Sequence, residues 1–494
     1  MQYPGLWAAV IVATALPWSA ASGTGDGDTA ALLAKHQAYV GWHVGDGVLK
    51  TLSAVGTATR DGKVVRQFKL LRYGQAYRLT TIREQGGRTA EGFTGSVAWT
   101  TSENGFTVRV VGDAARLMYS TQAVLGELTG TGAFTPALRR HETIGGVETV
   151  VLRLASAIGL PIEVAVDPAS GAYKRIVIDP EGKYEAKLDD VGYAEVGGKH
   201  FLSTWNRKDR KPTAYAYSKF ELNPAIDVNA LHPPSQTSSW TFGDGTAPIT
   251  VASYPVPRIF VDAVVNGRKG HFILDTGADG TYIRDSFLRA AGGKKFGTVE
   301  TWSLYGMENA NLYRVDTIGV GPSVLHEVIV NSGYPEAWYD WEGADGLLGF
   351  DIMAATIVEL NLDAKTLRIM DPAAVAPDAS KGYAVPVDVS DGHIRVPMKI
   401  DDTQEALAIL DTGSFDSILF ARDLVTRRHV RFGGRCATFG SLTMGPIRYE
   451  RPSACVTDAF AGDEMLLGMD FLSHLNYVFD YPESLVVMTP RKLP

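Results

Sequence analysis

The chain has 494 residues, of which 45% are apolar and 21% charged, and its formal net charge at pH 7 is −8. This length favours about three folded units, and the negative charge argues against non-specific binding to nucleic acid or to anionic membranes. No C-x-x-C, H-E-x-x-H or G-x-G-x-x-G element occurs, so the sequence predicts neither a metal site nor a dinucleotide cofactor.

The first apolar segment runs from Leu6 to Trp18 and is followed by small residues at positions 19–22. About a dozen apolar residues is short for a membrane span and typical of a signal peptide. We therefore expect residues 1–21 to be removed, which leaves no stable membrane span and places the folded protein in the periplasm or outside the cell. An uncleaved N-terminal anchor is the alternative.

Residues 29–240 are expected to form a β-rich N-terminal domain. Helix-like spacing occupies roughly residues 29–46 and 114–128, and the runs around them alternate apolar and polar residues between turn signals. The predicted strands are residues 67–73, 76–82, 96–101, 149–154, 162–166 and 173–178. This order fits a large, mostly antiparallel sheet with a helix laid on it.

Two phrases in this domain resemble the curved half-barrel of periplasmic lipoprotein-carrier proteins. They are G-F-x-G-x-x-A-W at residues 92–99 and D-P-A-S-G at residues 167–171. The resemblance implies a curved antiparallel sheet whose groove holds an apolar ligand, with Trp99, Tyr193 and Trp205 as lining residues. Aromatic residues also fill cores by default, and for these three we favour the core.

A duplicated pattern follows the polar stretch at residues 233–245, which is a predicted linker. The letters I-L-D-T-G occur at residues 273–277 and again at 409–413, each time at the end of an apolar, strand-like run. Each copy is followed by an L-L-G element, at residues 347–349 and 466–468. Two elements that recur in the same order indicate a duplicated half-site.

These motifs resemble the pepsin and retropepsin clan of aspartic peptidases over roughly residues 254–490, about half of the chain. Ala278 after the first D-T-G is typical of retropepsins and Ser414 after the second is typical of pepsins. The chain therefore looks like a fused retropepsin-like pair, a mainly β, bilobal double β-barrel. The expected lobes are residues 254–375 and 383–494. The dipeptide Asn266-Gly267 predicts a tight hairpin turn in the first of them.

The resemblance implies that Asp275 and Asp411 form a catalytic dyad without a cofactor. Two carboxylates that share one proton act as general base and general acid towards a water and a peptide carbonyl group. They do not both ionise when they lie about 3 Å apart, so their apparent pKa values split and the enzyme works best in acid. The expected substrate is a peptide or protein.

Supporting roles follow from the same resemblance. A threonine hydroxyl hydrogen-bonds across the lobe interface, and a glycine lets backbone N–H groups approach a carboxylate. In each lobe, the glycine of L-L-G packs behind the active loop. The residues concerned are Thr276, Gly277, Thr412, Gly413, Ser414, Gly349 and Gly468. The Ser414 hydroxyl is expected to bond Asp411, and Ala278 offers Asp275 no such group, so the two carboxylates should be unequal.

Further residues are candidates for a flap and for a specificity pocket. A hairpin near residues 302–307 is a candidate flap with Tyr305 and Gly306 at its tip, and a plain surface hairpin is the equal alternative. Its counterpart in the second lobe is placed near residues 439–442. The aromatic residues just before the first L-L-G either line a specificity pocket or pack in the core. They are Trp338, Tyr339 and Trp341. His271 is expected to be a packed or surface residue, because no nucleophile motif accompanies it.

The two cysteines, Cys436 and Cys455, are expected to form a disulfide, as suits an exported protein. Three alternatives stay open at this point. The D-T-G turns could be ordinary loop caps. The chain could be a non-catalytic exported binding protein that uses its N-terminal sheet for an apolar ligand or a protein partner. The N-terminal half could also be a propeptide-like cover that is released by cleavage near residues 233–245.

Overall fold

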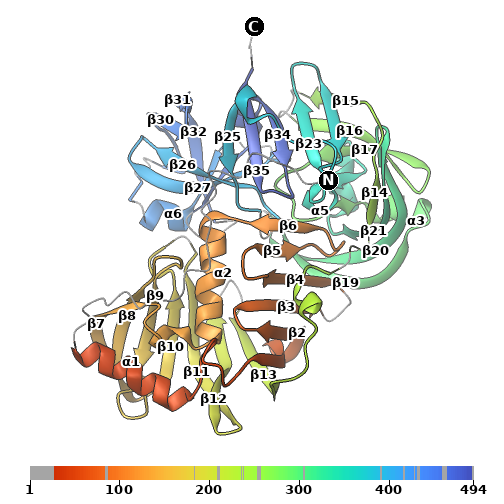
Figure 1. The fold of residues 1–494 in the computed structure, drawn as a ribbon. Coiled ribbons are helices and arrows are strands. Elements are labelled where there is room, and N and C mark those ends of the chain that lie inside the picture. The colour runs from red at the N-terminus through yellow and green to blue at the C-terminus, as the bar shows by residue number, and fades with distance from the viewer. Residues whose placement is uncertain are drawn as a thin grey trace.

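The structure, a computed structural model, describes residues 27–491 except 84–86, 183, 209–211, 235, 237, 253–257, 304–305, 390–391, 415–417, 428, 431–433 and 459–463. The predicted signal peptide, residues 1–21, lies outside the described residues. The fold is mainly β, as predicted, and consists of three sheets with short helices around them. Figure 1 shows two lobes side by side above a curved N-terminal sheet.

The N-terminal sheet has thirteen strands in the order β6-β5-β4-β3-β2-β1-β13-β12-β11-β10-β9-β8-β7. Their bounds are β1 Thr51–Arg60, β2 Lys63–Tyr73, β3 Ala76–Arg83, β4 Arg88–Phe93, β5 Ala98–Thr101, β6 Thr107–Val110, β7 Thr135–Ile144, β8 Val147–Ala155, β9 Ile162–Val166, β10 Tyr173–Ile178, β11 Ala186–Val196, β12 Lys199–Lys208 and β13 Pro212–Leu222. Helices α1 (Gly27–Val40) and α2 (Gly112–Leu125) lie against it. The two predicted helices and the six predicted strands of this part are thereby confirmed.

The aromatic residues proposed for a ligand groove in this sheet differ in burial. Trp99 is buried, and it lies directly opposite Gly92 on the neighbouring strand. A Cβ atom at Gly92 would stand 2.4 Å from the Trp99 ring, so only glycine leaves room for that ring. Trp205 is half-buried and stacks on Tyr215 with 5.3 Å between ring centroids, and Tyr193 is half-buried beside α1. Trp99 is therefore a core residue.

The second half of the chain builds a 14-stranded and an 8-stranded sheet. The first contains β14 Ser239–Thr241, β15 Ala247–Ala252, β16 Arg258–Val265, β17 Arg268–Leu274, β18 Tyr282–Ile283, β19 Lys294–Ser303, β20 Gly306–Val320, β21 Ser323–Ser332, β22 Gly346–Leu348, β23 Ile357–Asn361, β24 Thr366–Met370, β25 Tyr383–Pro386, β34 Leu475–Asp480 and β35 Leu485–Pro490. The second contains β26 Arg395–Ile400, β27 Gln404–Leu410, β28 Ile418–Ala421, β29 Cys436–Thr438, β30 Ser441–Met444, β31 Ile447–Glu450, β32 Ser453–Thr457 and β33 Glu464–Leu467.

The same order of elements occurs around both D-T-G motifs. A hairpin, β16–β17 or β26–β27, leads into each motif, and its second strand runs parallel to the L-L-G strand, β22 or β33. A short helix follows each L-L-G strand, α5 (Phe350–Met353) or α7 (Met469–Leu472). Asn266 and Gly267 have positive φ values of 49° and 82°, so the predicted tight turn is present in the first hairpin.

The last two strands tie the lobes together. β34 pairs with β23 of the first half, and β35 pairs with β25. These pairings produce a continuous run in the order β15-β24-β23-β34-β35-β25, which lies at the top of Figure 1 between the lobes. The lobes are therefore joined by a shared sheet as well as by the chain that connects them.

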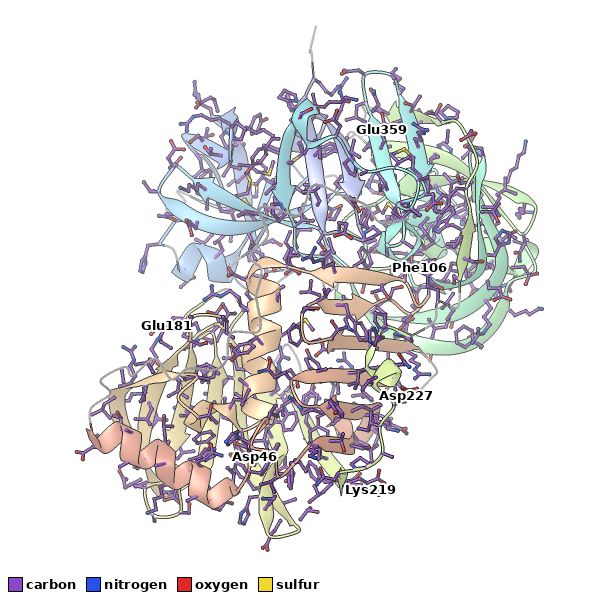
Figure 2. The ribbon with its side chains drawn as sticks, viewed as in Figure 1. Asp46, Phe106, Glu181, Lys219, Asp227 and Glu359 are labelled. Atoms are coloured by element: carbon purple, nitrogen blue, oxygen red, sulfur yellow. A yellow bond between two sulfur atoms is a disulfide. The ribbon has the colours of Figure 1, made fainter. Side chains whose placement is uncertain are left out.

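The N-terminal sheet is anchored to the first lobe through the loop between β5 and β6. The Asn104 side chain donates to the Ile329 carbonyl oxygen on β21 at 3.1 Å and accepts from the Ile329 N–H at 2.8 Å. Phe106 and Val108 are buried in the same apolar core as residues of both lobes. Figure 2 shows Phe106 at this junction. Phe106 and Val108 thus join the core of the second half, whereas other buried residues of the N-terminal domain form separate apolar clusters.

Candidate active site

The two D-T-G loops begin where the parallel strand pairs end. Leu274 is the last residue of β17 and lies opposite Leu348, and Leu410 is the last residue of β27 and lies opposite Leu467. The N–H of Asp275 then donates to the Leu348 carbonyl oxygen, and the N–H of Asp411 donates to that of Leu467, both at 3.0 Å. The L-L-G strand of each lobe therefore fixes the start of its D-T-G loop.

Four reciprocal hydrogen bonds join the two loops. The Thr276 hydroxyl donates to the Leu410 carbonyl oxygen, and the Thr412 hydroxyl donates to the Leu274 carbonyl oxygen, both at 2.7 Å. Each threonine N–H also donates to the hydroxyl oxygen of the other threonine at 3.1 Å. Both threonines are buried. This pattern holds the loops in a two-fold arrangement, across the interface that the resemblance implied for these hydroxyls.

The glycines let the two carboxylates face each other. A Cβ atom on Gly277 would stand 2.2 Å from Cγ of Asp411, and one on Gly413 would stand 2.2 Å from Cγ of Asp275. Each carboxylate therefore lies against the glycine of the opposite loop, and any side chain there would push it away. The two carboxyl groups are therefore close enough to perturb each other's pKa. Residues 136 positions apart in the chain thus meet at one point.

Burial and the neighbouring carboxyl group perturb the pKa values of both acids. Burial raises the pKa of Asp275 well above its usual value, and the neighbouring charge of Asp411 raises it further. Burial also raises the pKa of Asp411, while hydrogen bonds from Asp275 and from two backbone N–H groups oppose that rise. Both pKa values are therefore raised, and the two acids titrate as a pair, in which Asp411 accepts more backbone hydrogen bonds than Asp275 does.

Backbone N–H groups account for this inequality. Oδ1 of Asp411 accepts from the N–H groups of Gly413 at 2.9 Å and Ser414 at 2.8 Å, whereas Oδ1 of Asp275 accepts from the Gly277 N–H at 2.9 Å. A bond from the Ser414 hydroxyl to Asp411 stays a prediction. No sequence signal marks a backbone donor, because every residue except proline carries one.

The first L-L-G glycine packs tightly behind its loop. A Cβ atom on Gly349 would stand 2.1 Å from the Gly280 carbonyl oxygen, so any side chain would displace the loop that carries Asp275. The next residue, Phe350, donates its N–H to the Ala278 carbonyl oxygen at 2.9 Å. In the second lobe Gly468 occupies the corresponding place, between β33 and α7.

Several expected site residues lie elsewhere. Tyr305 lies outside the described residues, and Gly306 begins β20 opposite Ser303, so a long hairpin flanks the predicted flap tip. The flap expected at residues 439–442 is wrong, because Phe439 is buried in the core and stacks on Phe420 at 5.1 Å. His271 is partly exposed and pairs with Asp262 at 2.8 Å, as expected for a surface residue.

Helix α4 (Glu336–Glu342) carries the three aromatic residues that precede the first L-L-G. Tyr339 is buried, whereas Trp341 is 61% exposed and fits neither the pocket nor the core interpretation. Trp338 is half-buried and stacks on Tyr334 at 4.6 Å, and both pack in a cluster that includes Ala278. Burial and the charge of Asp275 raise the pKa of Tyr334, which places its phenol near the dyad. Sequence reasoning missed Tyr334.

Cys436 and Cys455 lie directly opposite each other on β29 and β32 and form the predicted disulfide. Within the described residues, no group of three or more His, Cys, Asp or Glu side chains is placed to hold a metal ion. No helix in the described part of the chain is long and apolar enough to cross a membrane.

Comparison with known proteins gives a partial match. Residues 261–352 match the family model described as Aspartyl protease, so this part of the chain is aspartyl protease-like. No curated protein matches the chain. A solved structure described as an outer membrane lipoprotein-sorting protein domain from Vibrio parahaemolyticus is 13% identical over 41% of this chain and 96% of its own. Its TM-score of 0.29 is too low to establish a shared fold.

Proposed function

We propose that this protein is an aspartic endopeptidase that hydrolyses peptide bonds with a water held between Asp275 and Asp411. The observation that carries the proposal is the pair of buried carboxyl groups, each packed against the glycine of the opposite loop, that the reciprocal threonine contacts bring together. The family match supports it for the segment that contains Asp275, and the recurrence of D-T-G and L-L-G extends it to Asp411.

Each carboxyl group has one task in the first step. Ionised Asp411 takes a proton from the water, whose oxygen attacks the carbonyl carbon, while protonated Asp275 gives its proton to the carbonyl oxygen. A neutral tetrahedral diol results. In the second step Asp275 takes back a hydroxyl proton, Asp411 gives its proton to the leaving nitrogen, and the C–N bond breaks. Asp275 is then protonated and Asp411 is ionised, as at the start of the reaction.

This mechanism requires one ionised and one protonated carboxyl group. Because burial raises the pKa of both acids, the singly protonated pair persists to a higher pH than an isolated aspartate would allow. Activity should fall on the acid side when Asp411 is protonated and on the alkaline side when Asp275 loses its proton. We expect a bell-shaped profile in acid.

The test is hydrolysis of a denatured protein substrate between about pH 3 and 6. We expect the parent to cleave it, and Asp275→Asn and Asp411→Asn each to abolish cleavage. Asp262→Asn is the matched control, because that carboxylate is exposed on β16 in the same lobe. A folded parent that cleaves nothing across this range would instead favour the non-catalytic binding protein.

We further propose that the two lobes are a fused retropepsin-like pair and that the protein is exported. Matching hairpins, parallel strand pairs and short helices in both lobes support the first part. The disulfide supports the second, because disulfides persist in oxidising compartments. Fractionation of expressing cells would test export, and recovery of the protein only from the reducing cytosol would contradict it.

A further inference from the structure

A buried ion pair reaches the active loops from the first lobe. Arg258, the first residue of β16, donates from Nη2 to Glu342 at the end of α4 at 2.7 Å. The two side chains are only 6% and 4% exposed. A second guanidinium nitrogen, Nη1, donates to the carbonyl oxygen of Gly413 at 2.5 Å. One side chain thus connects the first lobe, helix α4 and the catalytic loop of the second lobe.

The contact with Gly413 bears directly on the dyad. Gly413 is the glycine against which the Asp275 carboxylate packs, and its N–H donates to Asp411. The carbonyl group that Arg258 holds shares a peptide unit with the Ser414 N–H, which donates to Asp411 at 2.8 Å, so Arg258 holds backbone that contacts both catalytic carboxyl groups. A guanidinium presents several N–H donors in a fixed fork, so it can bind the Gly413 carbonyl and the Glu342 carboxylate together. The ammonium group of lysine is a compact point charge whose donors all lie on one nitrogen.

The second lobe contains a comparable pair that serves as an internal reference. Arg395, the first residue of β26, donates from Nε to Glu464, the first residue of β33, at 2.6 Å. Both residues belong to one lobe. The Arg258 pair joins α4 of the first lobe to the D-T-G loop of the second lobe.

We propose that Arg258 is a positioning residue for the catalytic dyad: it holds the Gly413 peptide in place against Asp275 and puts a positive charge beside that carboxyl group. The proposal rests on the proposed function only for the catalytic role of the dyad. The geometry that it invokes is the chain of contacts from Glu342 through Arg258 to Gly413.

The charged and titratable groups that face the dyad are few in the described part of the chain. Arg258 comes from β16, His393 from the segment before β26, Tyr334 from the segment after β21 and Tyr481 from the end of β34. The charge of Arg258 lowers the pKa of Asp275 against the larger upward effect of burial, and His393 acts in the same direction on Asp411. Arg258 is thus the cation that favours ionisation of Asp275.

The experiment separates charge from geometry with two variants and one control. Arg258→Lys keeps the charge and loses the fork. Arg258→Gln/Glu342→Gln removes both charges together, which avoids leaving a buried charge unpaired. Arg395→Gln/Glu464→Gln makes the same change in the second lobe. The readouts are kcat and KM on a peptide substrate, and the pH titration of the two carboxyl groups by NMR with 13Cγ-labelled aspartate, assigned with Asp275→Asn and Asp411→Asn.

We expect Arg258→Lys to lower kcat about tenfold with little change in KM, because a displaced loop misaligns the dyad. The charge-neutral variant should shift the titration of the Asp275 and Asp411 pair to higher pH, and the control should leave it in place. Full kcat in Arg258→Lys would overturn the positioning role. An unshifted titration in the charge-neutral variant, or an equal shift in the control, would overturn the electrostatic role.

Failure of the proposed function has a different signature. If the parent cleaves no substrate, the NMR titration still decides whether Arg258 acts on the two carboxyl groups. If the two aspartates of the parent titrate as independent, ordinary acids, the shared proton itself is refuted. If the charge-neutral variant does not fold, Glu342→Gln gives the electrostatic answer: it leaves the Arg258 charge without its counter-charge and should shift the titration of the pair to lower pH, and an unshifted titration would overturn the electrostatic role.

Discussion

Replacing Thr412 by valine removes two of the four hydrogen bonds that join the D-T-G loops, with almost no change in side-chain volume. The Leu274 carbonyl oxygen loses its donor at 2.7 Å, and the Thr276 N–H loses its acceptor at 3.1 Å. Both groups belong to buried residues, so water does not readily replace the lost partners. An unsatisfied buried polar group costs about 1–3 kcal/mol, so we expect the free energy of unfolding to fall by about 3 kcal/mol.

Urea denaturation followed by tryptophan fluorescence measures this change, with Thr412→Ser as the control that keeps the hydroxyl. Thr276→Val should cost a similar amount, because its two bonds mirror those of Thr412. Loss of the two bonds of one threonine should weaken the two bonds of the other. The free energy of unfolding of the double variant should therefore fall by less than the sum of the falls in the single variants. A fall of less than about 0.5 kcal/mol in Thr412→Val would show that these bonds do not hold the lobes together.

Three further predictions concern single contacts. Gly277→Ala places a methyl group 2.2 Å from Cγ of Asp411, which must then move. We expect kcat/KM to fall at least about 100-fold without loss of the circular dichroism signal. Near-normal activity would contradict the close approach of Gly277 to Asp411. Burial raises the pKa of Asp351 to about 7, so the folded state retains a proton that the unfolded state releases near pH 4. The free energy of unfolding of the parent should therefore fall as the pH rises from about 4 to 7, and Asp351→Asn should reduce this fall by up to about 4 kcal/mol; parallel curves would refute it. Cys436→Ser/Cys455→Ser should lower the free energy of unfolding by about 3 kcal/mol, and dithiothreitol should then have no further effect.

Short-range sequence patterns predicted the turns and strands that depend on neighbouring residues in the chain. The hairpin at Asn266-Gly267 follows from residues that adopt positive φ, and the strands of the N-terminal sheet follow from apolar alternation. The meeting of Asp275 and Asp411 followed from internal repetition, because a repeated half-site brings its parts to a common axis.

Contacts between distant segments were not predictable in this way. The pairing of β34 with β23 joins segments more than a hundred residues apart, and neither strand carries a signal for its partner. Tyr334 and Arg258 stand beside the dyad because of how α4 and β16 pack, and neither belongs to a motif. The second-lobe flap was misplaced because Phe439 and its neighbours pair and pack as core strands.

The anchorage of β6 affects the order in which the protein is completed during synthesis. The Arg109 N–H donates to the Pro482 carbonyl oxygen at 3.0 Å, and the Ser484 hydroxyl donates to the Arg109 carbonyl oxygen, 375 positions earlier in the chain. The edge strand β6 of the first sheet therefore gains these partners only after residues 482–484 have been synthesised. While the ribosome adds the intervening residues, that edge stays uncovered, so nascent chains stalled before residue 482 should be the form most prone to associate with one another.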